Sequence, residues 1–187
     1  MRAQNPAAVY RRHEDEVILK DLVFDARSAS WHGRDIFPYI LAAAEELMPD
    51  QPLRVVAAPD PGPLAAVLQI RGLQCVIQED TLGTAKLSVY RPAKPDPTSL
   101  VVLDYRRRSV DEAFRDLAII VHHLRPGEQF FVRGRRLPRS GLKALKQIGA
   151  IIDVDIDRFL EVQLLITRSQ GRCRPRPPVV PASSRVN

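Results

Sequence analysis

The chain has 187 residues, of which 45% are hydrophobic and 27% are charged, so it can bury either one medium core or two small ones. Charged residues interrupt any apolar run near the N-terminus, and no stretch approaches the roughly 18 apolar residues of a membrane span. We therefore expect a cytoplasmic protein without a membrane segment. The formal net charge of +6 is uneven: residues 1–95 hold 11 Lys and Arg against 12 Asp and Glu, whereas residues 96–187 hold 17 against 10.

After an N-terminal extension over residues 1–19, the first half of the chain predicts the order βαβαββ. Apolar, β-favouring runs indicate the strands, whereas apolar residues at helical spacing indicate the helices, the first of which is closed by Pro49. The predicted elements are strand 20–26, helix 35–48, strand 53–58, helix 63–71, strand 73–78 and strand 86–91.

A linker over residues 92–98 separates the halves, because its three prolines lack backbone donors and favour an extended chain. The second half predicts the same order, and Ser109 with Glu112 has the form of a capping box at its first helix. Residues 169–187 form a basic tail with four arginines and no acid, which we expect to be disordered. The predicted elements are strand 100–104, helix 110–124, strand 129–133, helix 140–148, strand 151–154, a turn near 155–158 and strand 159–167.

The pattern is a repeat. The strand that ends in Asp25 returns about 79 residues later at Asp104, and Leu47-Met48-Pro49 returns as Leu124-Arg125-Pro126-Gly127. This period is too long for a solenoid unit, so we interpret it as a tandem duplication. The predicted fold class is α+β, a two-layer α/β sandwich of order βαβαββ that occurs twice, with a core in each copy. The two predicted domains cover residues 20–91 and 99–168.

The predicted buried positions follow from the same periodicities. In the first copy they are Leu22, Phe24, Ile40, Leu47, Val55, Leu64 and Leu68. In the second copy they are Val102, Leu117, Val121, Phe131, Leu142 and Leu145.

The βαβαββ order, the Asp that closes the first strand, and Leu-x-Pro-Gly at Leu124-Arg125-Pro126-Gly127 resemble the TusA/SirA-like sulfur-carrier superfamily. The first copy, with Pro59-Asp60-Pro61-Gly62-Pro63-Leu64 and Ile70-Arg71-Gly72-Leu73, looks closest to an uncharacterised TusA-related bacterial family. The resemblance covers about residues 22–91 and 100–168. It implies a TusA-like fold in both copies.

The sulfur carriers hold a Cys-Pro at the start of their first helix, where the positive helix end stabilises a thiolate and its persulfide. In the second copy, Val110 and Asp111 stand at those two positions, and valine cannot carry sulfur. The corresponding loop of the first copy, residues 27–34, contains no cysteine. The resemblance therefore implies a tandem protein that lacks the sulfur-carrying residues.

Two cysteines lie elsewhere, and we expect both to be reduced. Cys75 alternates with Leu73 and Ile77, which predicts a core thiol. Cys173 lies between two arginines that favour its thiolate, so sulfur transfer by Cys173 or Cys75 stays open as an alternative. The sequence has no Walker loop, no Ser/His/Asp constellation and no zinc-ligand spacing, so we predict no catalytic residue, no metal and no cofactor.

A possible binding loop holds Trp31 and His32. A long polar loop has little reason to display a tryptophan unless the side chain packs onto the protein or binds something. Both interpretations stay open from the sequence.

Arginines are concentrated at one expected edge of the second copy. Two parallel strands joined by a right-handed helical crossover place their following loops at the same edge of the sheet. Guanidinium groups suit phosphate and carboxylate recognition, and the positive end of the helix that begins near Ser109 adds to their field. The alternative is a solvated basic face that Asp111, Glu112 and Asp116 partly neutralise. The predicted arginine rim consists of Arg106, Arg107, Arg108, Arg133, Arg135, Arg136 and Arg139.

From this rim we predict a non-catalytic accessory or adaptor protein that docks an anionic partner, either an acidic protein or a phosphate-bearing ligand. An RNA- or DNA-binding protein is the first alternative, because small sheets with basic rims serve that role. A degenerate sulfurtransferase is the second. The sequence does not indicate an oligomeric state.

Overall fold

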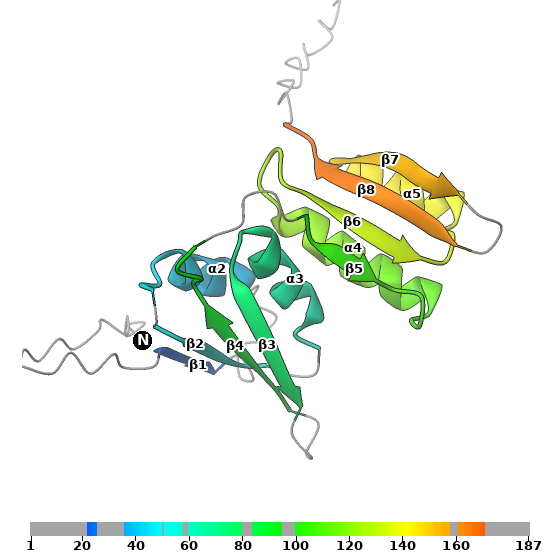
Figure 1. Ribbon diagram of the computed structural model, residues 1–187. Helices are drawn as coiled ribbons and strands as arrows, with labels where there is room; N and C mark the ends of the chain where they lie inside the picture. Colours follow the sequence, from blue (N-terminus) through cyan, green and yellow to red (C-terminus); the bar gives the residue numbers. More distant parts are fainter. Residues whose placement is uncertain are drawn as a thin grey trace, which may run out of the picture.

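The computed structural model describes residues 22–25, 36–49, 51–57, 60–79, 84–94, 100–157 and 161–170. These residues form a mixed α+β protein with four helices and two four-stranded sheets (Figure 1). None of the helices described is long and apolar enough to cross a membrane. The predictions for residues 1–19, for the loop with Trp31 and His32, and for the tail with Cys173 lie outside the described residues.

The first half has the order βαβαββ. Its strands lie in the sheet order β1-β2-β4-β3, in which β1 and β2 are parallel and the other pairs are antiparallel. The elements are β1 (Leu22–Asp25), α2 (Phe37–Glu45), β2 (Leu53–Ala57), α3 (Gly62–Ile70), β3 (Gln74–Glu79) and β4 (Ala85–Tyr90).

The second half has the same order of elements. Its sheet order is β5-β6-β8-β7, again with one parallel pair, β5 and β6, and two antiparallel pairs. The elements are β5 (Val102–Asp104), α4 (Val110–His123), β6 (Gln129–Gly134), α5 (Arg139–Gln147), β7 (Ala150–Asp157) and β8 (Val162–Arg168).

Local signals set several of these boundaries. The predicted capping box at α4 is confirmed, because the Glu112 backbone N–H donates to the Ser109 hydroxyl while the Glu112 carboxylate accepts from the Ser109 N–H. Gly149, with φ +97°, follows α5 in a conformation that side chains rarely adopt. The predicted turn at 155–158 is wrong at its start, since a register shift between Val154 and Ile156 lets β7 continue to Asp157.

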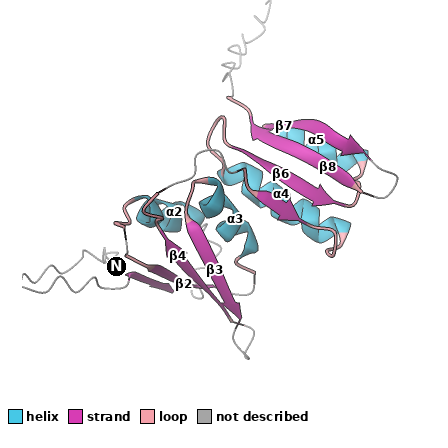
Figure 2. Ribbon diagram, in the orientation of Figure 1, coloured by secondary structure: helices cyan, strands magenta, loops and turns pink. Residues whose placement is uncertain are grey.

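Helices α3 and α4 lie where the two halves meet, whereas α5 lies farther from the first half (Figure 2). Helix α3 of the first half packs against α4 of the second half, and the two lie side by side in Figure 1. This contact explains the composition of α3, in which every residue from Pro63 to Leu68 is buried. A helix that is apolar on all sides must be covered on all sides, and here its own sheet covers one side and α4 the other.

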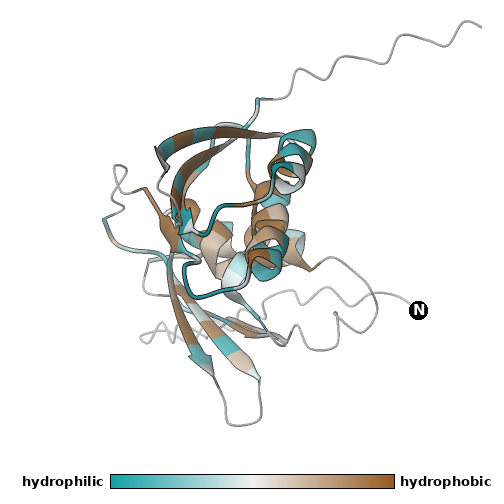
Figure 3. Cartoon of the chain, turned by 90° about the vertical axis from the view of Figure 1, so that its right-hand side faces the viewer, coloured by the Kyte–Doolittle hydropathy of each residue, from teal (hydrophilic) through white to brown (hydrophobic). Residues whose placement is uncertain are grey.

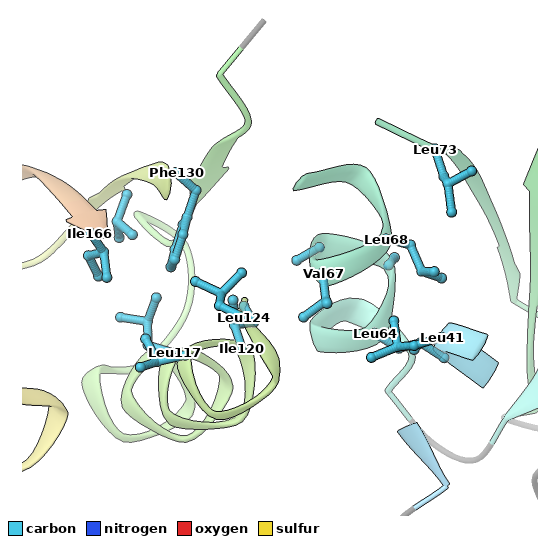
Figure 4. Close-up of a cluster of buried hydrophobic side chains, with 14 of the residues drawn as sticks. Leu41, Leu64, Val67, Leu68, Leu73, Leu117, Ile120, Leu124, Phe130 and Ile166 are labelled. Atoms are coloured by element: carbon cyan, nitrogen blue, oxygen red, sulfur yellow. The ribbon is translucent and has the colours of Figure 1, made fainter. Parts of the chain in front are cut away.

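The buried side chains form one cluster that spans both halves, so the expectation of two separate cores is wrong. In Figure 4, Val67 of α3 points toward Ile120 and Leu124 of α4, and these in turn lie near Phe130 of β6. The apolar face of each helix is wider than one sheet can cover. The two halves therefore complete each other's core.

Most predicted core positions whose side chains the structure describes are buried, and Leu142 is partly buried against the cluster. The side chains of Leu22 and Phe24 lie outside the described part. Two predicted positions are wrong: Val102 is 49% exposed, and Phe131 is only half-buried while its neighbour Phe130 is fully buried. Both mispredicted residues lie on the face of their sheet away from the helices. Hydrophilic and hydrophobic bands alternate along the strands in Figure 3, as expected where one sheet face packs and the other does not.

The shared core predicts that the halves unfold together. Replacing Val67 with Ala should lower the free energy of unfolding by about 2 to 3 kcal/mol, because two buried methyl groups are lost and a cavity remains. Hydrogen exchange in both sheets should accelerate together, as measured by mass spectrometry. Val23→Ala, at a site that is 66% exposed, is the control and should change stability by less than about 0.5 kcal/mol. Acceleration in the first sheet alone would contradict a shared core.

Candidate functional site: the arginine rim of the second sheet

The parallel pairing of β5 and β6 brings two arginine-bearing loops together. Asp104 at the end of β5 lies opposite Arg133 in β6, so the loops that follow both strands leave the sheet at the same edge. The backbone N–H of Tyr105 donates to the Arg133 carbonyl at 2.7 Å, which fastens one loop to the other strand. A Cβ at Gly134 would meet the Tyr105 Cβ at 3.3 Å, so this close approach depends on glycine.

Arg106 is neutralised by Asp104, the last residue of β5. Its guanidinium donates to both carboxylate oxygens of Asp104, with an Nη2 to Oδ2 distance of 2.5 Å, and its backbone N–H also donates to that carboxylate. These hydrogen bonds hold the pKa of Asp104 at about 2. Asp104 therefore stays ionised, and Arg106 contributes little net charge to the rim.

Arg108 connects the two halves. Its Nη1 donates to Asp60 in the loop before α3 at 2.8 Å and to Asp116 on α4 at 2.9 Å. Burial raises the pKa of Asp116, and the positive charge of Arg108 counteracts this. Burial also acts against ionisation of Asp60, but the hydrogen bonds from Arg108 and from the Gly62 N–H outweigh it and lower the pKa of Asp60. Arg108 is thus an internal clamp and not a free rim residue.

The remaining rim arginines point to solvent. Arg107, Arg135 and Arg139 are exposed and make no hydrogen bond or ion pair with any residue that the structure describes. Arg133 is exposed and donates to the Gln163 side chain at 3.4 Å. Arg136 is also exposed, but it takes part in an interaction and is not free. The structure therefore brings the seven predicted arginines to one edge but divides them into neutralised and unneutralised members.

The two helix starts at this edge differ in charge. Helix α4 begins with its capping box and carries Asp111 and Glu112 in its first turn, so its positive end is already compensated. Helix α5 begins after Pro138 without a side-chain cap, has no acid in its first turn, and starts with Arg139. The sequence predicts that the positive end of α4 strengthens the field of the rim. In the structure it is α5 whose positive end is uncompensated.

An open hollow lies beside the rim. It is lined by Asp104, Arg106, Arg107 and Glu161, two arginines and two carboxylates. Its two carboxylates disfavour a continuous track of phosphates, and among the described residues Arg107 is the lining cation without a carboxylate partner.

A second set of ion pairs, which the sequence did not indicate, joins the halves at the opposite end of α4. Arg71 donates to the Glu45 carboxylate at 2.8 Å and to the His123 carbonyl at 2.9 Å, and Arg125 also pairs with Glu45. The His123 ring stacks on Phe37 of α2, with ring centroids 4.4 Å apart. The apolar composition of α3 was the available signal, since it required a cover that only the second half can supply.

The two residues that the resemblance placed at the sulfur-carrier position, Val110 and Asp111, lie at the start of α4. Val110 is half-buried, and Asp111 beside it is exposed. Cys75 lies on the helix side of the first sheet, opposite Val89, where it packs against the core as a thiol. Burial raises the pKa of Cys75 to about 12, so the thiol is protonated at neutral pH.

No family model matches this chain, and neither a curated protein nor a solved structure shows significant similarity to it.

The ion pairs of Arg108 predict that the variant Arg108→Met loses stability and that the size of this loss depends on pH. Because the folded-state pKa of Asp116 is raised, stability falls as pH rises through that pKa, and losing Arg108 raises it further. Asp60 has a lowered pKa, so its contribution is present at neutral pH, fades as pH falls, and disappears with Arg108. We expect a deficit of about 1 to 2 kcal/mol at pH 7, less than for a fully buried pair because the Arg108 side chain is 41% exposed.

The deficit should shrink as the pH falls through the pKa of Asp116 and then that of Asp60, as measured by urea unfolding across pH. Arg107→Met is the matched control, because Arg107 has no partner among the described residues, and it should leave stability nearly unchanged. A deficit of equal size at every pH would argue against the clamp.

The burial of Cys75 predicts low reactivity. On incubation of the folded protein with a persulfide donor at pH 7, intact mass and peptide mapping should show sulfur on Cys173 at most. The same treatment in urea should modify both cysteines, which controls for intrinsic reactivity. Stoichiometric, transferable sulfur on Cys75 in the folded protein would restore the sulfurtransferase interpretation.

Proposed function

We propose that the two halves are tandem TusA-like domains that have no sulfur-carrying Cys-Pro. The equal order of elements and the equal strand order of the two sheets support this proposal. A valine at the position of the persulfide cysteine leaves no group that could accept sulfur there. The proposal makes the protein a non-catalytic member of a sulfur-carrier lineage in the cytoplasm.

The function that follows is docking of an anionic partner by the arginine rim of the second half. One observation carries it: Arg107, Arg135 and Arg139 have no carboxylate partner among the described residues and lie at one sheet edge, beside the uncapped start of α5. Fixed cations near a positive helix end attract carboxylates and phosphates. The protein therefore acts as an adaptor whose second half presents positive charge.

An acidic protein fits this edge better than nucleic acid. Arg106 and Arg108 are bound to carboxylates, and Glu161 lines the hollow beside Arg107. A polyphosphate would meet these acids along any path across the rim, whereas a protein partner can place its own charges between them. RNA or DNA binding is thus the alternative that the same experiment tests.

The test is a double charge reversal, Arg107→Glu with Arg135→Glu. Affinity for a fluorescein-labelled oligoglutamate peptide should fall by about tenfold or more in fluorescence anisotropy, because two attractive contacts become repulsive. Thermal stability should hardly change, since both side chains are exposed and unpaired in the described part of the chain. The wild-type affinity should decline with added salt.

The matched control is Lys94→Glu with Lys146→Glu, which changes net charge equally at exposed positions away from the rim. An equal loss in this control would mean that overall charge and not the rim determines binding. Tighter binding of a single-stranded oligonucleotide, with a steep salt dependence, would favour the nucleic-acid alternative.

A further inference from the structure

The outer face of the second sheet is open. Residues of β6 and β8 alternate, with one set buried under the helices and the other set on the opposite face. No described element covers that opposite face, because α4 and α5 lie on the helix side (Figure 2). It carries Val102 and Ile151, each 49% exposed, with the half-buried Phe131 and Leu165 between them.

The strand registers show that this apolar surface is specific to the second sheet. The row Val102, Phe131, Leu165 and Asp153 crosses all four strands two residues before the edge that holds Asp104 and Arg133. The matching row of the first sheet is Val23, Arg54, Ser88 and Val76. The centre of the first sheet's outer face is therefore Arg and Ser, as expected for a solvated face, whereas that of the second is Phe and Leu.

The charged residues around this surface are separated, with arginines toward the rim and an aspartate on the edge strand β7. Arg133 lies in the next row toward the rim, on the same face as Phe131, and Arg107 and Arg135 follow beyond the strand ends. Asp153 lies at the other border, on the edge strand β7. An apolar row with cations along one side complements a peptide in which apolar residues are followed by acidic ones, and Asp153 repels those acids from the β7 border.

From this arrangement we infer that the outer face of the second sheet, together with the rim, binds an extended polypeptide segment in which a run of apolar residues is followed by acidic residues. The apolar side chains cover Phe131 and Leu165, and the carboxylates meet Arg133 and the unpaired rim arginines. The inference rests on the proposed function, because the rim supplies the charge and the sheet face selects a polypeptide. Nucleic acid is disfavoured, since Phe131 is the single aromatic residue of this face among the described residues and Asp153 borders it.

The experiment uses two labelled peptides of equal length and charge, one with four leucines followed by four glutamates and the other with four serines followed by four glutamates. The full chain should bind the leucine peptide about tenfold or more tightly, from the added apolar contact. The double variant Phe131→Thr with Leu165→Ser should reduce this affinity to that of the serine peptide. Val76→Thr, on the outer face of the first sheet, is the matched control and should have no effect.

Circular dichroism and thermal unfolding check that the variants fold. If the double variant does not fold, Val102→Thr tests the same surface at a more exposed position, where we expect a smaller loss of affinity for the leucine peptide alone.

Three results would overturn the inference. Equal affinity for both peptides, with sensitivity to Arg107→Glu and Arg135→Glu retained, removes the sheet face but leaves the rim as the proposed function. No sensitivity to those arginines removes both proposals. A dimer in sedimentation velocity, or an oligonucleotide, that depends on Phe131 and Leu165 would assign the surface to a second copy or to nucleic acid.

Discussion

The packing of α3 against α4 is the contact on which the rest of the structure depends. Helix α3 has no polar face, so its own sheet cannot bury it completely, and α4 supplies the missing cover. This packing encloses Asp116 of α4, whose buried carboxylate requires a cation. Arg108 meets that requirement and reaches Asp60 with the same nitrogen, so one desolvated carboxylate fixes the loop that starts α3. Ion pairs of Arg71 and Arg125 with Glu45 close the other end.

Because α3 and α4 face each other, the sides that they share are not available to partners. The surfaces left free include the outer faces of the two sheets and the loops at their edges. Two groups can be distinguished among the arginines of the rim. Arg106 and Arg108 form ion pairs with nearby carboxylates. By contrast, Arg107, Arg135 and Arg139 have no such partner in the described residues. Counting cations in the sequence therefore overestimates the charge that a partner meets.

Sequence periodicity was sufficient for the order of the elements and for the loops that share an edge, because both follow from local patterns and from the parallel crossover. It was not sufficient for the face of β6, where Phe130 and Phe131 are adjacent and either one could point inward. Arg133 lies two residues after Phe131 and therefore on the same face of β6. The charge of Arg133 was the available signal that this face points outward. The clamp of Arg108 was beyond prediction, because it joins residues 48 positions apart through an interface between halves.

The halves differ in what they expose, and this difference constrains how the protein can work. The first half presents a polar outer face, and its apolar surplus lies in α3, which the second half covers. The second half presents the apolar outer row and the unneutralised arginines, while its α4 depends on α3 for part of its burial. Separated from the first half, the second half would expose its α4 surface to water, and Arg108 would lose its ion pair with Asp60. The rim and the outer sheet face therefore belong to one half but need both halves to be held in place.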